Sequence, residues 1–273
     1  MKCFYISLES AKDRQQSIEE SFKRTAYSGW SLERITAFDA GHMQRNPKPG
    51  QLNLAEKACF LSHTEAIRRS LSHDGHVFIL EDDVIFSDKT FHALDALLKH
   101  QSTPTWDLFY TDIGPAYMAD MIRLAVMKTK AVAGQVKTLN LREMPFFGAT
   151  SYLVHERSKA KALGILDAVT SFDVAYDAFL CKAVSQGALD AHAVFPFLTT
   201  ISDLANTSSI QPDGLRGSNL VSNLFNQLMW IDGSADLHRE KLDAIEASLG
   251  KEARAFGMIW AALVDKGSMV REV

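Results

Sequence analysis

The fold of this chain is indicated by the stretch Val77-Phe78-Ile79-Leu80-Glu81-Asp82-Asp83-Val84, in which four apolar residues are followed by three carboxylates. A short apolar run of this kind is typical of a strand that is buried in a parallel sheet. Three adjacent carboxylates repel one another, so they must face water or bind a cation. Ligands bind beyond the carboxyl ends of such strands, and Mg²⁺ and Mn²⁺ prefer oxygen ligands. We therefore expect a divalent cation carrying a diphosphate here; a solvated acidic turn is the alternative for the triplet alone.

Strand-like and helix-like segments alternate through the first two thirds of the chain, which predicts an α/β fold with a mostly parallel central sheet. The apolar runs and helical spacings predict strands at 2–8, 32–38, 77–80, 108–111 and 151–155, and crossover helices at 11–27 and 54–71. A further helix is expected to begin after Asp88, as its N-cap, and to run to residue 98. The segment 41–50 is predicted to be a loop, and 116–143 a basic insertion near the site.

The length of 273 residues favours one large domain with an appendage. A cluster of Ser, Asn, Pro and Gly at 202–219 precedes a segment that is helical in pattern to the end of the chain. We therefore divide the chain into a domain at 1–218 and a C-terminal helical appendage at 219–273.

The composition of the chain limits its cellular location and the classes of molecule that it can bind. No apolar run approaches the roughly 20 residues that cross a bilayer, and the apolar run at the N-terminus is too short for a signal peptide. Cys3, Cys59 and Cys181 show no paired or metal-binding spacing, which favours reduced thiols and a cytoplasmic protein. The net charge of −4 and the absence of a basic stripe argue against a nucleic-acid partner.

A second motif, Cys59-Phe60-Leu61-Ser62-His63, is predicted to lie on a helix that packs near the acidic strand. Adjacent residues on a helix point about 100° apart. Ser62 and His63 therefore cannot act on each other as nucleophile and base, which argues against a hydrolase triad.

Together these segments closely resemble glycosyltransferase family 25, the lipopolysaccharide and collagen galactosyltransferase group. The resemblance covers most of residues 2–210. Its blocks are, in order, the strand at 4–8 with Asp13-Arg14, the turn Ala37-Phe38-Asp39, the Cys-x-x-Ser-His helix at 59–63, Glu81-Asp82-Asp83, and the later segments 106–108, 148–154, 160–163, 176–180 and 208–210. The chain departs from the family at Ser7 (usually Asn), Ala40 and Ala58 (usually Gly) and Ala175 (usually Pro). No departure removes a carboxylate, so we expect the chemistry to survive.

The resemblance implies a GT-A-like fold, that is, a Rossmann-type nucleotide-sugar-binding domain. It also implies a UDP-sugar donor, typically UDP-galactose, with Mn²⁺ or Mg²⁺ as cofactor and inversion to a β-linked product. The expected transfer is of galactose or glucose to a saccharide or glycolipid acceptor such as lipopolysaccharide or lipooligosaccharide. A lipid-linked acceptor suggests peripheral contact with the inner face of a membrane, through Arg123, Lys128, Lys130 and Lys137 and the C-terminal helices; a solvated loop is the alternative for these four residues.

Residue roles follow from the strand geometry and the family blocks. Successive strand residues alternate in direction, so Glu81 and Asp83 are predicted to project to one side and Asp82 to the other. Asp83 is the predicted metal ligand, with Glu81 as a second ligand or a donor contact. Asp82 is assigned to the donor, where ribose is one candidate partner. Other residues assigned to the donor are Ser7, Leu8, Asp13, Arg14, Ser62 and His63; for Asp13 and Arg14 a solvated helix start is the alternative.

Inversion in a single displacement requires a carboxylate base on the face opposite the leaving group. Asp177 and Asp173 are the candidates, and they share one helix face if the segment 172–184 is helical. Asp177 falls in a family block and is preferred. For Asp173 the favoured explanation is a charge that interacts well with the helix dipole.

Two other classes of function remain open from the sequence. A noncatalytic carbohydrate-binding or scaffold protein would keep the fold without turnover. A metal-dependent phosphohydrolase or nucleotidyltransferase would use the same acidic cluster, although the chain has no glycine-rich phosphate loop. Release of UDP only in the presence of a saccharide acceptor separates all three.

Overall fold

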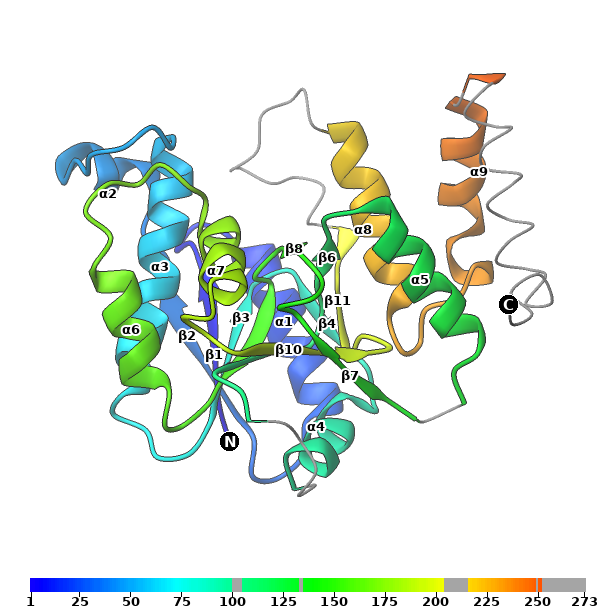
Figure 1. Ribbon diagram of the computed structural model, residues 1–273, viewed down its shortest axis with the longest axis horizontal. Helices are drawn as coiled ribbons and strands as arrows, with labels where there is room; N and C mark the ends of the chain where they lie inside the picture. The colour runs from blue at the N-terminus through cyan, green and yellow to red at the C-terminus, as the bar shows by residue number, and fades with distance from the viewer. Residues whose placement is uncertain (100–104, 133–134, 204–215, 249, 252–273) are drawn as a thin grey trace.

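A computed structural model describes residues 1–99, 105–132, 135–203, 216–248 and 250–251. Its centre is a seven-stranded sheet in the order β2-β1-β3-β9-β5-β10-β7 (Figure 1). Five of these strands run in the same direction, whereas β9 and β7 run against them. The expected mostly parallel α/β sheet is therefore confirmed. The strands are β1 (Lys2–Ser7), β2 (Ser31–Thr36), β3 (Val77–Glu81), β5 (Leu108–Tyr110), β7 (Lys137–Asn140), β9 (Ser151–Val154) and β10 (Ala191–Phe195).

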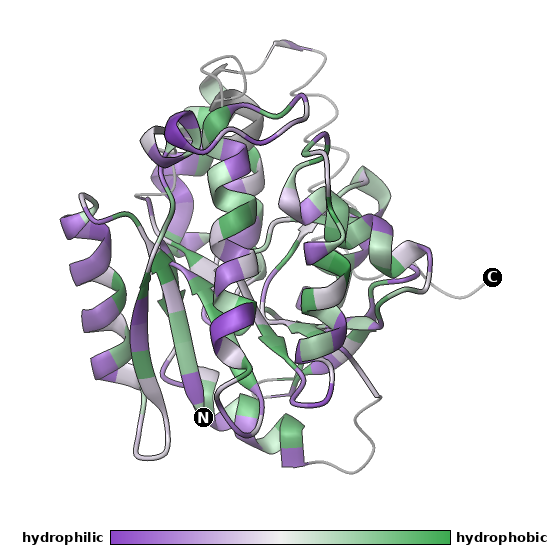
Figure 2. Ribbon diagram, turned by 90° about the vertical axis from the view of Figure 1, so that its left-hand side faces the viewer, coloured by the Kyte–Doolittle hydropathy of each residue, from purple (hydrophilic) through white to green (hydrophobic). Residues whose placement is uncertain are grey.

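Both faces of the sheet are covered, which explains why β3 is a continuous apolar run. Phe4 and Ile79 pack into one core, with α3 (Leu54–Ser70), α6 (Lys159–Asp167) and α7 (Tyr176–Ser185). Tyr5 and Phe78 pack into the other, with α1 (Lys12–Thr25) and α4 (Thr90–Lys99). Figure 2 shows the consequence: the strands are mostly hydrophobic, while the helices carry both hydrophobic and hydrophilic stripes.

Two small sheets lie at the edge of the molecule at which β3 and β5 end. One sheet pairs β4 (Val84–Phe86) with β11 (Thr199–Ile201), and the other pairs β6 (Gly114–Pro115) with β8 (Phe146–Phe147). α3 begins with a capping box, in which Asn53 and Glu56 each accept a hydrogen bond from the other's backbone N–H, and this fixes where the helix starts.

The structure corrects three local predictions. The expected loop at 41–50 contains α2 (Ala40–Arg45), because the Asp39 carboxylate caps that helix by accepting from the His42 N–H. At α4 the hydroxyl of Ser87, rather than Asp88, accepts from the backbone of Lys89. The expected insertion at 116–143 contains α5 (Met118–Thr129) and also β7, so part of it belongs to the central sheet itself.

The C-terminal part begins with α8 (Arg216–Met229), followed by a short 3₁₀ helix (Asp236–His238) and α9 (Arg239–Ser248). α8 packs against β11 and α5, as the grouping of these elements in Figure 1 shows. This helix spans the position between 218 and 219 at which the sequence divides the chain; that division stays a prediction. The family block at 208–210 and the expected helix beyond residue 251 lie outside the described residues. None of the helices that the structure describes is long and apolar enough to cross a bilayer.

Candidate active site

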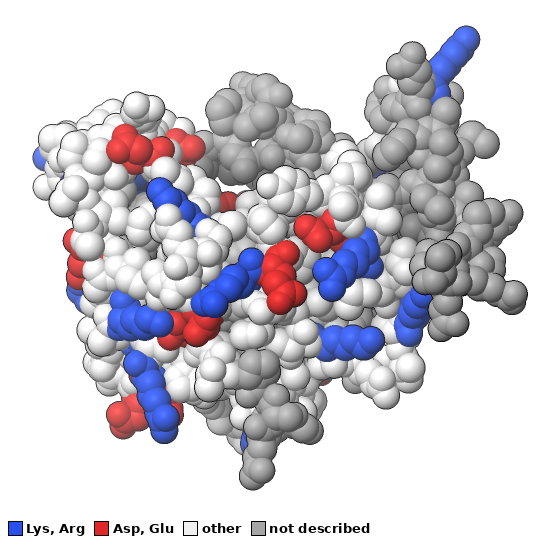
Figure 3. Space-filling model, in the orientation of Figure 1, with Lys and Arg blue, Asp and Glu red and all other residues white. Residues whose placement is uncertain are grey.

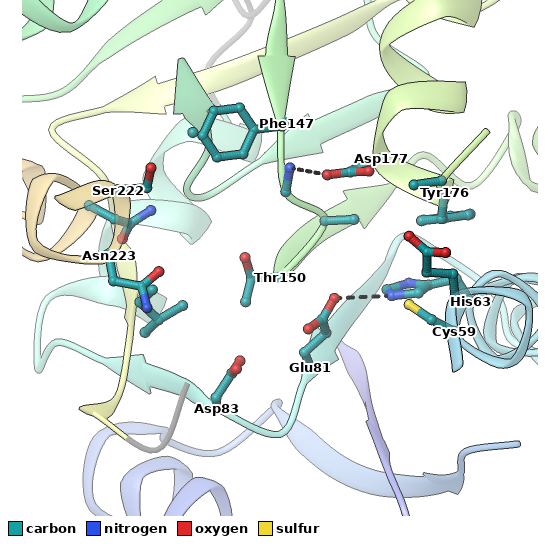
Figure 4. A pocket seen from close by; sticks show the side chains of 17 residues that line it. Cys59, His63, Glu81, Asp83, Phe147, Thr150, Tyr176, Asp177, Ser222 and Asn223 are labelled. Atoms are coloured by element: carbon teal, nitrogen blue, oxygen red, sulfur yellow. Dashed lines mark hydrogen bonds and ion pairs between the residues drawn. The ribbon is translucent and has the colours of Figure 1, made fainter. Parts of the chain in front are cut away.

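A pocket of about 280 Å³ opens at the edge where β3 and β5 end (Figure 4). Its walls come from α3, the end of β3, β6, the segment from β8 to the turn before β9, the start of α7, β11 and α8. The lining residues are Glu56, Cys59, His63, Glu81, Asp83, Gly114, Phe147, Gly148, Ala149, Thr150, Ala175, Tyr176, Asp177, Ile201, Ser222, Asn223 and Asn226.

The acidic triplet alternates as strand geometry predicts. Glu81 and Asp83 line the pocket, and Asp82 does not. Asp82 accepts a hydrogen bond of 2.6 Å from the hydroxyl of Ser7, and its other oxygen lies 3.1 Å from Nε of Arg14. Burial raises the pKa of Asp82, and Arg14 and Ser7 act against that rise. Ser7 and Arg14 thus hold the triplet in place from behind the pocket.

Asp83 has one satisfied and one unsatisfied carboxylate oxygen. Its Oδ2 accepts from Arg14 at 2.5 Å, whereas its buried Oδ1 has no hydrogen-bond partner among the described residues. The residue is 7% exposed. Burial and the charges of Glu81 and Asp82 raise the pKa of Asp83 to about 7, against the lowering effect of Arg14. An unpaired buried carboxylate oxygen beside a polar pocket is the kind of donor that a hard divalent cation satisfies.

His63 is fixed on both sides. Its Nε2 lies 3.3 Å from Oε1 of Glu81, its Nδ1 lies 3.1 Å from the Tyr152 hydroxyl, and its ring stacks on Tyr176 with centroids 4.3 Å apart. Figure 4 shows Glu81 turned toward this ring. Burial acts to raise the pKa of Glu81, but the hydrogen bond and charge of His63 outweigh it, so that the pKa lies below its usual value. Glu81 is therefore an ionised side chain that His63 orients.

Cys59 lies beside His63 and Glu81, and the three ligand atoms are within 4.8 Å of one another. The sequence reasoning saw no metal-binding spacing at this cysteine; the i, i+4 relation of Cys59 and His63 on one helix was the signal available. Sulfur and imidazole ligands suit zinc better than Mn²⁺ or Mg²⁺. Burial raises the pKa of the Cys59 thiol, which disfavours the thiolate that metals bind.

Asp177 stands on another wall of the pocket, in the first turn of α7, and Figure 4 shows open space between it and Asp83. Its Oδ2 accepts from the Gly148 N–H at 2.8 Å, and its Oδ1 from its neighbour Ala178 N–H at 2.8 Å. Gly148 has a φ of +85°, which a glycine adopts without strain, and this places its N–H toward the carboxylate.

Asp173 lies outside the pocket. It precedes α7, which begins at Tyr176, so the expectation that Asp173 and Asp177 share a helix face is wrong. Its exposed carboxylate accepts from the Gln51 N–H at 2.9 Å and joins two loops. Hydrogen bonds from Ser171 and from Gln51 lower the pKa of Asp173.

Three other residues assigned to the donor also lie outside the pocket lining. The Ser62 hydroxyl accepts from the Phe38 N–H at 2.9 Å and donates to the Ala58 carbonyl at 2.7 Å, so it holds a loop against α3. The Leu8 carbonyl accepts from the side chain of Gln15 at 2.6 Å. Asp13 is exposed on α1. Their roles in donor binding stay predictions.

The fold brings to this edge several residues that the sequence patterns did not identify as site residues. Thr150, Asn223 and Asn226 line the pocket, the last two from α8, and Asn226 accepts from the Thr200 hydroxyl at 2.9 Å. Asp112 follows β5 as Asp83 follows β3. That position after an apolar strand was the signal that could have identified it.

The sequence model of glycosyltransferase family 25, described as an LPS biosynthesis protein family, matches residues 1–180. No curated protein matches the chain.

Solved structures that match are distant. A glycosyltransferase involved in the glycosylation of the major capsid of PBCV-1 is 11% identical with a TM-score of 0.30, over 61% of this chain and 65% of that one, so the chain spans about 65% of its length. An inositol-1-phosphate CTP transferase from T. maritima is 11% identical with a TM-score of 0.36, over 79% and 93%. A nucleoside-diphosphate-sugar pyrophosphorylase from Vibrio cholerae RC9 is 10% identical with a TM-score of 0.30, over 71% and 72%.

Proposed function

Because the chain belongs to glycosyltransferase family 25, we propose that it transfers galactose or glucose from a UDP-sugar to a saccharide acceptor, with inversion and with Mn²⁺ or Mg²⁺ as cofactor. The observation that carries this proposal is the placement of two carboxylates in one pocket. Asp83 presents a buried, unpaired oxygen at the end of β3, and Asp177 lies on another wall. One carboxylate is thus available for a metal–diphosphate and the other for the acceptor.

The donor set at the end of β3 fits a hard divalent cation. Oδ1 of Asp83 would hold the ion, and Glu81 contributes a second ionised carboxylate on the same side. When bound, such an ion stabilises the negative charge that develops on the departing diphosphate. Arg14 pairs with Asp82 and Asp83, and its positive charge offsets the electrostatic repulsion among the three carboxylates.

Asp177 would accept the proton of the attacking sugar hydroxyl. A general base must lie within hydrogen-bond reach of that proton. The N–H groups of Gly148 and Ala178 donate to its two oxygens and fix the carboxylate. His63 and Tyr176, which stack on each other, line the same pocket, and His63 positions Glu81.

The acceptor we propose is the saccharide of a lipopolysaccharide or lipooligosaccharide, in keeping with the description of the family. The test is UDP release from UDP-galactose and UDP-glucose, with and without a saccharide acceptor and Mn²⁺. The proposal expects release only with acceptor. Release independent of acceptor would indicate a phosphohydrolase, and saccharide binding without any release would indicate a noncatalytic protein.

We also propose that the protein works at the cytoplasmic face of a membrane and contacts the lipid surface without inserting. Arg123 is exposed on α5, Lys130 is exposed just after this helix, and Lys137 is exposed at the start of β7. The side chains of Tyr117 and Met118, at the start of α5, are also exposed. Figure 3 shows basic and acidic side chains interspersed on one face of the protein, so such a contact would rest on a local patch.

Lys128 does not belong to that patch. Its ammonium donates to the carbonyl oxygen of Trp230, and burial lowers the pKa of Lys128 to about 8. We therefore leave it out of the surface that meets lipid.

Replacing Arg123, Lys130 and Lys137 together by Ser is expected to weaken binding to anionic vesicles on the order of 100-fold at low salt, since each basic residue near such a surface contributes about 1 kcal/mol. Cosedimentation with phosphatidylserine-containing vesicles measures this. A matched variant with Lys12, Lys23 and Arg24 of α1 replaced by Ser should bind as the wild type does. No wild-type binding at low salt, or equal binding by both variants, contradicts the proposal.

A further inference from the structure

A second buried carboxylate lies at the edge of the sheet where Asp83 lies. Asp112 comes two residues after β5 and is 1% exposed. Its Oδ1 accepts from the Ser151 hydroxyl at 3.0 Å, and no donor lies within hydrogen-bond distance of its buried Oδ2 among the described residues. Burial raises the pKa of Asp112 to about 7, and the hydroxyls of Ser151, Thr199 and Thr150 act against that rise. Asp112 thus repeats the pattern of Asp83, with one oxygen held and the other unsatisfied.

The sheet register places the two aspartates at the same edge of the sheet, two strands apart. β9 lies between β3 and β5, and its first residue, Ser151, pairs with Leu80 on one side and accepts from the Thr111 N–H at 3.2 Å on the other. Two strand spacings, about 10 Å, separate the ends of β3 and β5. Each aspartate continues the chain past one of these ends, on either side of Ser151. The charge of Asp112 acts to raise the pKa of Asp83, although burial and the charges of Glu81, Arg14 and Asp82 have larger effects on that pKa.

A network of hydroxyl groups holds Asp112 in this position. The side-chain oxygens of Thr111, Ser151 and Thr199 lie 2.6 to 2.7 Å from one another, and Ser151 donates to Asp112. Thr199 begins β11, which pairs with β4 immediately after Asp83. The same segment returns to Asp83 itself, whose carbonyl oxygen accepts from the Ser202 N–H at 2.7 Å. One rigid frame therefore connects both aspartates.

Two buried carboxylate oxygens without donors are costly unless something satisfies them. A cation between the two carboxylates would satisfy both oxygens at once. Mg²⁺ and Mn²⁺ bind through one or two carboxylates and complete their coordination shell with phosphate and water. Glu81 is less suited to be the second ligand, since His63 already engages one of its oxygens. A protonated Asp112 without a metal role is the alternative that an experiment must exclude.

We propose that Asp112 is the second carboxylate ligand of the divalent cation, with Asp83 as the first. This inference rests on the proposed function, because it assigns a ligand for the metal that the proposed transfer uses.

The test is Mn²⁺ binding in the presence of UDP, measured from the electron paramagnetic resonance signal of free Mn²⁺ and therefore without any turnover. Asp112→Asn is expected to weaken Mn²⁺ binding by at least about 10- to 100-fold, because losing a mere partner of a metal ligand already costs that much. The matched control is Asp107→Asn, a buried aspartate just before β5 that pairs with Lys161 and Ser158. It should bind Mn²⁺ as the wild type does. Wild-type Mn²⁺ affinity in folded Asp112→Asn overturns the inference.

A second variant separates ligation from a general loss of structure. Asp112→Cys is expected to weaken Mn²⁺ binding but to bind Cd²⁺ more tightly than Asp112→Asn does, since soft metals prefer thiolate. A ratio of Cd²⁺ to Mn²⁺ affinity in Asp112→Cys no higher than in the wild type would show that residue 112 does not touch the metal, and would overturn the inference even if Asp112→Asn proves unstable.

The two proposals fail in distinguishable ways. If Asp83→Asn loses Mn²⁺ and Asp112→Asn does not, the inference is wrong and the proposed function stands. If Mn²⁺ binds through both aspartates but no acceptor ever releases UDP, the transfer is wrong and the metal site stands. If the wild type with UDP binds no Mn²⁺ yet transfers sugar, the inference and the cofactor of the proposed function are both wrong.

Discussion

Asp83→Asn is expected to lower sugar transfer by at least about 10³-fold and to remove the Mn²⁺ dependence of UDP binding, because a metal at a phosphate supplies several kcal/mol of charge stabilisation. Asparagine keeps the shape of the side chain but removes the charge that would hold the cation. Isothermal calorimetry with UDP, in the presence and absence of Mn²⁺, measures the binding part.

The same variant should remain folded. The Oδ1 of Asp83 is buried and unpaired, and Arg14 keeps Asp82 as its partner after the substitution. The unfolding midpoint at pH 8 is therefore expected to equal or exceed that of the wild type. Asp88→Asn, an exposed aspartate five residues further along, is the control and should leave Mn²⁺-dependent UDP binding intact. Unchanged UDP affinity with Mn²⁺ in Asp83→Asn would show that this carboxylate does not hold the metal.

Local sequence patterns were sufficient for the central strands and for the acidic strand end. The run from Val77 to Leu80 is apolar at every position because helices cover both faces of the sheet, and this burial is visible in a single segment. The two-residue period likewise predicted that Glu81 and Asp83 would share a side. Both inferences depend on neighbours in the sequence alone.

Site residues that depend on contacts between distant segments could not be predicted in the same way. Asp112 becomes a neighbour of Asp83 only through β9, which enters the sheet between β3 and β5 and runs against both. Asn223 and Asn226 reach the pocket only because α8 packs against β11. The periodicity of a sequence reveals neither the order of strands in a sheet nor the packing of α8 against β11.

The pair Asp173 and Asp177 shows a different limit. Spacing by four places two residues on one face only within a helix, and α7 begins at Tyr176, after Ala175 in an extended conformation with ψ of 152°. Helix starts are the least certain part of a sequence-based assignment. The family block at 176–180 nevertheless selected the aspartate that the fold places in the pocket.

Asp177→Asn is expected to lower turnover by roughly 10² to 10⁴-fold while donor affinity stays close to that of the wild type, since a general base acts on the transition state rather than on bound donor. The amide keeps the size of the side chain, and its single oxygen can still accept from the Gly148 or the Ala178 N–H group. What it removes is the capacity to accept a proton. Steady-state turnover and calorimetric UDP-sugar affinity, measured on the same preparation, separate the two effects.

Asp173→Asn is the matched comparison, because it changes the same residue type four positions earlier, in an exposed loop that touches Gln51. Its turnover should stay near that of the wild type. Wild-type turnover in Asp177→Asn would remove this residue from the reaction, and a large loss in Asp173→Asn instead would transfer the role of base to it. Equal losses of donor affinity and turnover in Asp177→Asn would mean that the carboxylate shapes the donor site, which the proposed role as base does not allow.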